Sequence, residues 1–433
     1  MQAGFAFLEA GSVRAKNTTN IIMKNIIDAG IGALGYWATG YAFGYGGENN
    51  PFIGTNQFFL INTPPLEYAN FFVAYVFALA SSTIVSGALA ERTQLHAYIL
   101  FTSLMGMFIY PVVTHWVWND AGWLNDLDYH DFAGSSVVHV VGGVGALAGA
   151  TIVGPRIGRF SKGKVNPIPG HSVVLLALGF FLLWFGFFAF NAVSEGGIIG
   201  DGFSTGATAR AVVNTSLAAS AAIVSSLMIS KIGFTKQEMS MFGREFKMFT
   251  IFGGYWSVNS AVNGGLTGMV AICAGCDAVE PWAAMVIGLI AGLIYHFFAR
   301  ALLLLRIDDP VVATAIHLCG GVWGVIAVAL FASKDKLDAL PNGGILYAWN
   351  GDAFIFFGIQ CIGVAVIAAW SFFWTGLLFG SLRIMGLLRV SESQENDGLD
   401  FIDGEPAYPM DPAILEAYAN SENFSDTDEK SFQ

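Results

Sequence analysis

The chain has 433 residues, of which 55% are hydrophobic and only 12% are charged. A soluble domain carries about 25% charged residues, so this composition excludes a soluble enzyme, a disordered protein and a nucleic-acid-binding protein. Four cysteines in so long a chain also exclude a disulfide scaffold, and we interpret the pair Cys273–Cys276 as structural or incidental. The composition therefore predicts an integral membrane protein.

The first thirteen residues, MQAGFAFLEAGSV, are apolar but too few to cross a bilayer. A helix of this length is about 20 Å long, whereas the hydrocarbon core is about 30 Å thick and needs about 20 residues. The segment also lacks the basic start and the longer apolar run of a signal peptide. We therefore expect the second half of a transmembrane helix whose first half is missing.

Ten further stretches are long and apolar enough to cross a membrane as helices. Glycine is frequent within them, as is typical of transmembrane helices that pack closely. The predicted spans are approximately residues 18–45, 68–90, 95–118, 132–154, 172–194, 208–230, 248–273, 282–305, 311–333 and 354–386. The sequence thus predicts an all-α membrane protein built as a helical bundle.

The distribution of Lys and Arg predicts the orientation of these spans. If residues 14–17 lie inside and the spans alternate, seventeen of the 20 basic residues fall inside and only Arg210, Lys334 and Lys336 fall outside. Basic residues favour the cytoplasmic side of a membrane. This arrangement places the C-terminus in the cytoplasm.

The net charge of −12 belongs almost entirely to the C-terminal end of the chain. Residues 391–433 contain twelve acidic residues and one basic residue, which gives −11 and leaves −1 for residues 1–390. Low hydrophobicity with scattered Pro, Ser and Asn favours disorder. We therefore divide the chain into a transmembrane domain, residues 1–390, and an acidic cytoplasmic tail, residues 391–433.

Two of the predicted spans share one pattern. DFAGSSVVHVVGGV begins at Asp131 and DPVVATAIHLCGGV begins at Asp309, and each reads Asp, seven residues, His, two residues, Gly-Gly-Val. The pattern places His139 and His317 at equivalent positions, five spans apart, so that the two segments run in opposite directions. Such an inverted repeat indicates a functional site near the midplane of the membrane.

The spacing within the repeat also predicts a depth. Eight helical residues carry each His about 12 Å into a core whose half-thickness is about 15 Å. The glycines at i+3, Gly142 and Gly320, should let the helix backbones approach closely. A single intramembrane His could be a hydrogen-bonded core residue, but two at matched depth favour a functional pair.

Two neutral imidazoles can share a proton and still offer a hydrogen bond to a small molecule. This chemistry suits a polar, neutral or deprotonatable substrate, or a proton relay. It does not suit Na⁺ or K⁺, which need rings of oxygen ligands. A zinc site is also not expected, because the sequence offers no third ligand at a matching depth.

Seven motifs in this chain resemble those of the ammonium transporter, methylammonium permease and Rhesus protein family, and more closely its ammonium transporter branch. They run in the family's order along nearly the whole chain. The resemblance implies eleven helices in two inverted five-helix halves, the first helix being incomplete here, and a homotrimer with one pore per subunit. The motifs are AGFAFLEAGSVRAKN (3–17), SGALAER (86–92), YPVVTHWVW (110–118), DFAGSSVVHVVGG (131–143), FGFFAFNAVS (185–194), DDPVVATAIHLCGGVWG (308–324) and GLDFIDGEPAYP (398–409).

The resemblance implies an outer recruitment site for ammonium, formed by Phe77, Trp118 and Ser194. Ammonium over an indole face gains about 0.5–2 kcal/mol of cation–π energy, and Ser194 can accept a hydrogen bond from it. Asp131 matches the family's buried acid near this site. From the residues alone it could equally cap the following helix, as we expect of Asp309.

The resemblance also implies the residues of the pore. Phe77 and Phe190 match the family's stacked phenylalanine gate, and Phe190 lies one helical turn before Ser194 on the same face. His139 and His317 match the family's twin histidines. The chain has 37 Phe, so the residue type alone would not single out the gate.

A transporter, and not an enzyme, is therefore expected, with no cofactor and no metal. Ammonium captured outside would lose its proton near the gate and cross as ammonia past the two histidines, and methylammonium is a further candidate substrate. The expected partners are the lipid bilayer, two further copies in a homotrimer and a cytoplasmic regulator of the tail, with no nucleic acid. We expect the protein in the plasma membrane.

Two alternatives stay open. One is an ammonium sensor that signals through its cytoplasmic tail. The other is a Rhesus-like channel for neutral ammonia or carbon dioxide, against which Trp118 and Ser194 argue because they would capture a cation.

Overall fold

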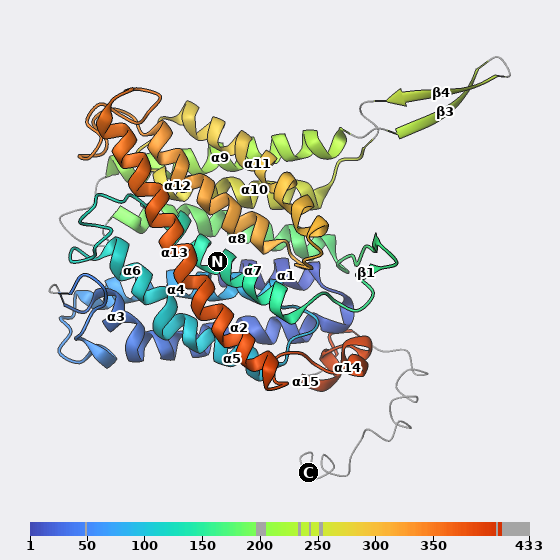
Figure 1. The fold of residues 1–433 in the computed structure, drawn as a ribbon, viewed down its shortest axis with the longest axis horizontal. Coiled ribbons are helices and arrows are strands. Elements are labelled where there is room, and N and C mark those ends of the chain that lie inside the picture. Colours follow the sequence, from blue (N-terminus) through green and yellow to red (C-terminus); the bar gives the residue numbers. More distant parts are fainter. Residues whose placement is uncertain are drawn as a thin grey trace, which may run out of the picture.

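The computed structural model describes residues 1–47, 50–195, 205–232, 235–241, 244–250, 254–403 and 406–408, which form a bundle of helices (Figure 1). The first half of the bundle contains α1 (Gln2–Ser12), α2 (Thr18–Gly35), α3 (Tyr41–Tyr45), α4 (Glu67–Ala88), α5 (Leu95–Leu104), α6 (Tyr110–Trp118) and α7 (Val141–Val153). The second half contains α8 (Val173–Ala192), α9 (Thr205–Lys231), α10 (Val258–Ile272), α11 (Pro281–Leu304) and α12 (Gly320–Phe331). The long helix α13 (Gly351–Ile384) then crosses the other helices diagonally, and α14 (Glu392–Asp397) and α15 (Asp400–Asp403) follow it.

Short turns and two hairpins complete the chain. Four π-helical turns, η2 (Tyr36–Gly40), η4 (Met105–Ile109), η5 (Ser135–Val140) and η8 (Thr314–Cys319), continue directly into an α-helix. The 3₁₀ turns are η1 (Ala15–Asn17), η3 (Phe58–Leu60), η6 (Val193–Glu195) and η7 (Cys273–Gly275). Strands β1 (Phe160–Ser161) and β2 (Lys164–Val165) pair antiparallel, as do β3 (Thr235–Met241) and β4 (Arg244–Thr250), and the second hairpin extends away from the bundle (Figure 1).

Within the described residues, eight helices are long and apolar enough to cross a membrane. They coincide with eight of the ten predicted spans. A ninth prediction, residues 18–45, forms one continuous helical run through α2, η2 and α3, but it carries Lys24 and Asp28. The tenth, residues 248–273, is wrong at its start, because β4 ends at Thr250 and α10 begins only at Val258. A short apolar run does not distinguish a strand from a helix by its pattern alone.

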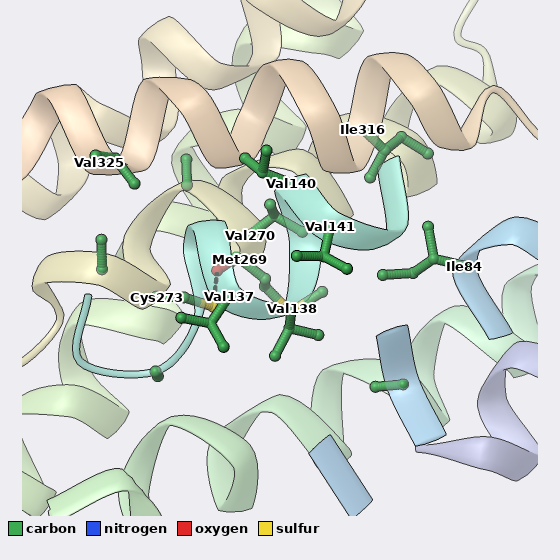
Figure 2. Packing of buried hydrophobic residues seen from close by; sticks show 14 of the residues in the cluster. Ile84, Val137, Val138, Val140, Val141, Met269, Val270, Cys273, Ile316 and Val325 are labelled. Carbon is green, nitrogen blue, oxygen red and sulfur yellow. Dashed lines mark hydrogen bonds between the residues drawn. The ribbon is translucent and has the colours of Figure 1, made fainter. Parts of the chain in front are cut away.

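The two halves meet in an apolar core around η5. Figure 2 shows Val137, Val138 and neighbouring valines of this segment packed among residues of α4, α10, η8 and α12. These side chains are almost entirely buried; they include Ile84, Val140, Val141, Met269, Val270, Ile316 and Val325. The residues of the first repeat motif are thus held rigidly by helices from both halves.

Glycines set the crossing of the two repeat segments, but one position later than predicted. A Cβ added at Gly143 would lie 2.3 Å from the backbone N of Leu318, and one at Gly321 would lie 2.3 Å from the carbonyl O of Ser135. The predicted glycines Gly142 and Gly320 instead face α4 and α10. The prediction assumed α-helical spacing, whereas a π turn holds about one more residue and rotates the residues that follow it.

Basic residues that we predicted to lie on one side of the membrane meet at one end of the bundle. Arg156 is buried there and donates to Asp308 Oδ2 over 2.8 Å and to Glu91 Oε1 over 3.1 Å. Arg14 donates to the second oxygen of Glu91 over 2.5 Å, and Arg159 lies 3.2 Å from Asp308. Burial would raise the pKa of Asp308, but the hydrogen bonds and charge of Arg156 outweigh it and lower this pKa to about 2.

The start of the acidic tail packs against this end of the bundle. A capping box at Ser391 begins α14, and Glu395 binds Arg389 over 2.8 Å. Asp400 accepts hydrogen bonds from the backbone N–H groups of Thr19 and Asn20 at the start of α2. Residues 391–403 therefore do not show the disorder that their composition predicts, because buried partners offset their charge. Residues 409–433 lie outside the described residues.

Candidate functional site

A cavity of about 420 Å³ is lined by residues of α3, α4 and α6. In Figure 1 α3 and α6 lie at one end of the bundle, and α14, which packs beside the arginine network, lies toward the other end. Its lining includes the four residues predicted to bind substrate: Phe77, Trp118, Asp131 and Ser194. They come from α4, α6, the loop before η5 and the turn after α8. The fold thus brings together residues that are more than one hundred positions apart in the chain.

Trp118 is held rigidly in the cavity wall. Its indole N–H donates to the carbonyl O of Asp131 over 2.7 Å, and its ring packs edge-on against Phe77 at 5.6 Å. A Cβ at Gly134 would lie 3.2 Å from the indole ring, and Gly134 has a φ of +89°, so the turn beside Trp118 needs glycine. Ser194 donates its hydroxyl proton to the carbonyl O of Phe190, which leaves the lone pairs of Ser194 Oγ free to accept.

Asp131 acts as the cap of η5. Its buried carboxylate accepts the backbone N–H groups of Gly134 and Ser135 on Oδ1, and those of Ser136 and Val137 on Oδ2. The hydroxyl of Ser136 adds a fifth hydrogen bond, of 2.6 Å. Because its two oxygens accept all of these hydrogen bonds, the Asp131 side chain holds the start of the helix that carries His139 against the cavity.

Asp309 occupies the corresponding place in the second repeat. Its carboxylate accepts the backbone N–H of Thr314 over 2.8 Å at the start of η8. The prediction that Asp309 caps this helix is confirmed.

A column of rings leads from the cavity into the protein. Phe77 and Phe190 stack face to face with 3.9 Å between their centroids, below Trp118. Phe190 in turn lies 5.8 Å from the ring of His139, and Phe187 stacks on the same imidazole at 5.7 Å. Both stacked phenylalanines are at most 4% exposed, so they close the path between the cavity and the histidines.

His139 and His317 lie together in the core, each within a π turn. Their Nδ1 atoms are 3.1 Å apart and their rings lie nearly parallel, with centroids 5.1 Å apart. Both are buried, at 0% and 4% exposure. At this distance one Nδ1 carries a hydrogen and the other accepts it, so the two rings share one proton. On the far side of His317 lies Phe5 of α1, at 6.3 Å.

Sequence reasoning missed several polar neighbours of this path. Glu67 lines the cavity and accepts hydrogen bonds from Tyr41 and Asn70. Cys273, which we interpreted as structural or incidental, has its Sγ 3.7 Å from His139 Nε2 and donates to Asn191 Oδ1 over 3.2 Å. Glu67 had one signal, an acid at the start of an apolar span, but the position of Cys273 depends on long-range packing.

The chain is similar along most of its length to ammonium transporters of other organisms. "Ammonium transporter 3" of Dictyostelium discoideum is 40% identical over 409 residues, which cover 92% of this chain and 88% of that protein. "Putative ammonium transporter 1" of Caenorhabditis elegans is 42% identical over 431 residues, or 95% of this chain and 76% of that protein. Among solved structures, "Sensor Amt Protein" aligns with a TM-score of 0.80 and 35% identity over 93% of this chain and 94% of that chain. Mep2 of Candida albicans aligns with a TM-score of 0.77 and 26% identity over 91% and 83%. The sequence profile of the Ammonium Transporter Family matches residues 1–244 and 246–408, and the chain therefore belongs to that family.

Proposed function

We propose that this protein transports ammonium across a membrane through a pore within each subunit. The observation that carries the proposal is the continuous column from Trp118 through Phe77 and Phe190 to His139 and His317. It begins in an open cavity and ends at a buried proton-sharing pair. Membership of the family supports ammonium as the substrate.

Capture takes place in the outer cavity. The face of Trp118 attracts the cation, Ser194 Oγ accepts one of its N–H bonds, and the carboxylate of Asp131 adds negative potential from below. Glu67 adds a second carboxylate to the cavity wall. Potassium has no N–H group to donate to Ser194 Oγ, and a single hydroxyl oxygen does not replace the ring of oxygen ligands that potassium needs, so this site favours ammonium.

Passage requires the loss of a proton, because a bare cation would be costly in the apolar interior. The Phe77–Phe190 stack admits only a small molecule when its rings move apart. The resulting ammonia meets His139 and His317, where one ring nitrogen can accept a hydrogen bond from it and the pair can carry a proton. These steps assign substrate binding, gating and pore lining to the residues predicted for those roles.

The remaining features follow from the same proposal. The arginine network at the opposite end lies in the cytoplasm, as does the tail, and the cavity faces outside at the plasma membrane. Exposed apolar residues on α8, α9, α11 and α13 face lipid or other copies in a homotrimer. A cytoplasmic regulator would act through residues 391–433.

Reconstitution of the full chain in liposomes tests the proposal. We expect uptake that saturates with ammonium, and no comparable uptake of potassium. Growth of transport-deficient yeast on limiting ammonium gives an independent readout. Rescue of growth would exclude a pure sensor, and ammonium-dependent currents would exclude a channel for neutral gas. Absence of both uptake and rescue in correctly folded protein would overturn the proposal.

A further inference from the structure

Glu9 is a buried acid that the proposed pathway does not use. It lies on α1, is 2% exposed, and follows Phe5 by four residues, so both side chains share one helix face. Phe5 is the residue whose ring lies beside His317. Glu9 is therefore placed about one helical turn beyond the histidine pair, toward the arginine end of the bundle.

The two halves of the bundle show that Glu9 has a counterpart next to His139. Helices α1 and α8 run along each other in direct backbone contact, since a Cβ at Gly179 would lie 2.2 Å from the backbone N of Leu8. Residues 4–12 of α1 read GFAFLEAGS, and residues 186–194 of α8 and η6 read GFFAFNAVS. In this alignment Phe5 corresponds to Phe187, which stacks on His139, and Glu9 corresponds to Asn191.

The partners of Asn191 define the cluster on the outer side. Its amide donates to Thr215 Oγ1 of α9 over 2.8 Å, and its oxygen accepts from Cys273 Sγ over 3.2 Å. Cys273 Sγ in turn lies 3.7 Å from Nε2 of His139. The cluster is polar, uncharged, and in contact with the first histidine.

The partners of Glu9 form the matching cluster on the inner side. Asn25 of α2 donates to Glu9 Oε2 over 2.7 Å, and Ser86 of α4 donates to the same oxygen over 2.6 Å. Helices α1, α2 and α4 are the counterparts, in chain order, of α8, α9 and α10. The equivalent position between three helices thus holds the amide of Asn191 on the outer side and the carboxyl of Glu9 on the inner side.

The second oxygen of Glu9 is available for a proton. Among the described residues no hydrogen bond is made to Oε1, which lies in a gap left by Gly87. A Cβ at Gly87 would be 2.9 Å from Oε1 and 2.3 Å from Val311, which precedes the η8 turn carrying His317. Two donors on Oε2 leave Oε1 as the atom that carries the proton when the carboxyl is neutral.

Other charged groups lie near Glu9 but are committed elsewhere. Asp28 accepts hydrogen bonds from Tyr98 and Thr102, of 2.6 and 2.7 Å. Lys24 lies over the ring of Tyr98, with its amine 5.6 Å from the centroid. Both interact electrostatically with Glu9, and their effects oppose each other: the Lys24 amine attracts the Glu9 carboxylate, whereas the Asp28 carboxylate repels it.

We propose that Glu9 is the proton-exchanging group of the inner half of the pore, an inference that rests on the proposed ammonium transport. A proton released by ammonium at the outer cavity passes through the His139–His317 pair and reaches Glu9. The neutral carboxyl then gives the proton on Oε1 to ammonia leaving His317: the O–H bond breaks, an N–H bond forms, and ammonium and a carboxylate result. The next proton from the histidine pair restores the neutral carboxyl. One charge then crosses with each ammonia.

The Glu9→Gln variant tests this role, because glutamine keeps the shape and the acceptor for Asn25 and Ser86 but cannot release a proton. Ammonium-evoked current and labelled methylammonium uptake are measured on the same oocytes expressing the full chain. We expect current to fall about tenfold or more, as is typical for loss of a positioned acid, with the half-saturating concentration within about twofold of the parent. Glu9→Asp should restore part of the current. Ser12→Ala, on the same helix, serves as the matched control and should resemble the parent.

Several outcomes would overturn the inference. One is a Glu9→Gln current within about twofold of the parent at equal surface expression. Another is that the parent protein itself takes up methylammonium without any current. If Glu9→Gln fails to reach the surface, Ser86→Ala decides, since loss of one hydrogen bond to the carboxyl should lower the current about threefold to tenfold. An unchanged Ser86→Ala current then refutes the role. A parent protein that moves no ammonium would instead refute the proposed function.

Discussion

Replacing Trp118 by Leu should weaken the apparent affinity for ammonium and leave the maximal rate less affected. The indole ring lines the outer cavity, and its cation–π contact is worth about 0.5–2 kcal/mol. Its loss corresponds to an increase of about threefold to thirtyfold in the half-saturating concentration. The effect falls mainly on affinity because Trp118 lies above the Phe77–Phe190 stack and does not touch the histidines.

The structure adds a second contribution to this change. The indole N–H donates to the carbonyl O of Asp131, and a buried hydrogen bond is worth about 0.5–1.5 kcal/mol. Trp118→Phe separates the two effects, because it keeps an aromatic face but loses the N–H. We expect Trp118→Phe to lie between the parent and Trp118→Leu in half-saturating concentration.

The assay is the concentration dependence of ammonium-evoked current in oocytes, normalised to the amount of protein at the surface. Ammonium and potassium are compared in the same cells, so a general change in conductance is recognised. If Trp118→Leu reached the surface normally and its half-saturating concentration equalled that of the parent, Trp118 would not bind the cation.

Three further predictions concern the pore, the inner network and the tail. His139→Ala or His317→Ala should abolish ammonium transport or its selectivity over potassium, because the proton-sharing pair is lost. The protein should stay folded, because the remaining imidazole loses only one hydrogen bond, which costs about 1–3 kcal/mol. Normal rate and selectivity in both variants would make the pair structural. The low pKa of Asp308, about 2 in the folded protein against an ordinary 3.8, stabilises the fold above pH 4 by about 2 kcal/mol, and this is lost as the pH falls toward 2. Acid unfolding followed by tryptophan fluorescence should show this step in the parent and lack it in Asp308→Asn. Deletion of residues 411–433 should leave uptake largely intact, whereas deletion of 391–433 should reduce it strongly because it removes the packed α14 and α15; equal uptake by the two would place the boundary elsewhere.

The inverted repeat was predictable because it is written in both segments of the chain. The Asp, His and Gly-Gly-Val pattern correctly placed His139 and His317 at matched positions, and the structure brings their Nδ1 atoms to 3.1 Å. The π turns that hold both histidines were not predictable, because the residues of η5 and η8 have no composition that separates a π turn from an α turn. For the same reason the glycine at the crossing was assigned one position too early.

The acidic tail shows a different limit. Its composition predicts disorder, yet Glu395 and Asp400 are buried against Arg389 and the start of α2. Composition measures how much apolar surface a segment can bury by itself, and it does not register partners supplied by the rest of the chain.

The sequence by itself determined that the protein is a membrane-embedded helical bundle with an inverted repeat, because hydrophobic length and local patterns are properties of single segments. The family resemblance added Phe77, Trp118, Phe190 and Ser194, and the structure places them in the cavity and in the column of rings below it. Only the tertiary structure decided which polar groups lie near that column, including Cys273 beside His139 and Glu9 one helical turn from Phe5. The side chains that meet in the pore come from helices far apart in the chain, and packing between those helices decides which of their faces turn inward.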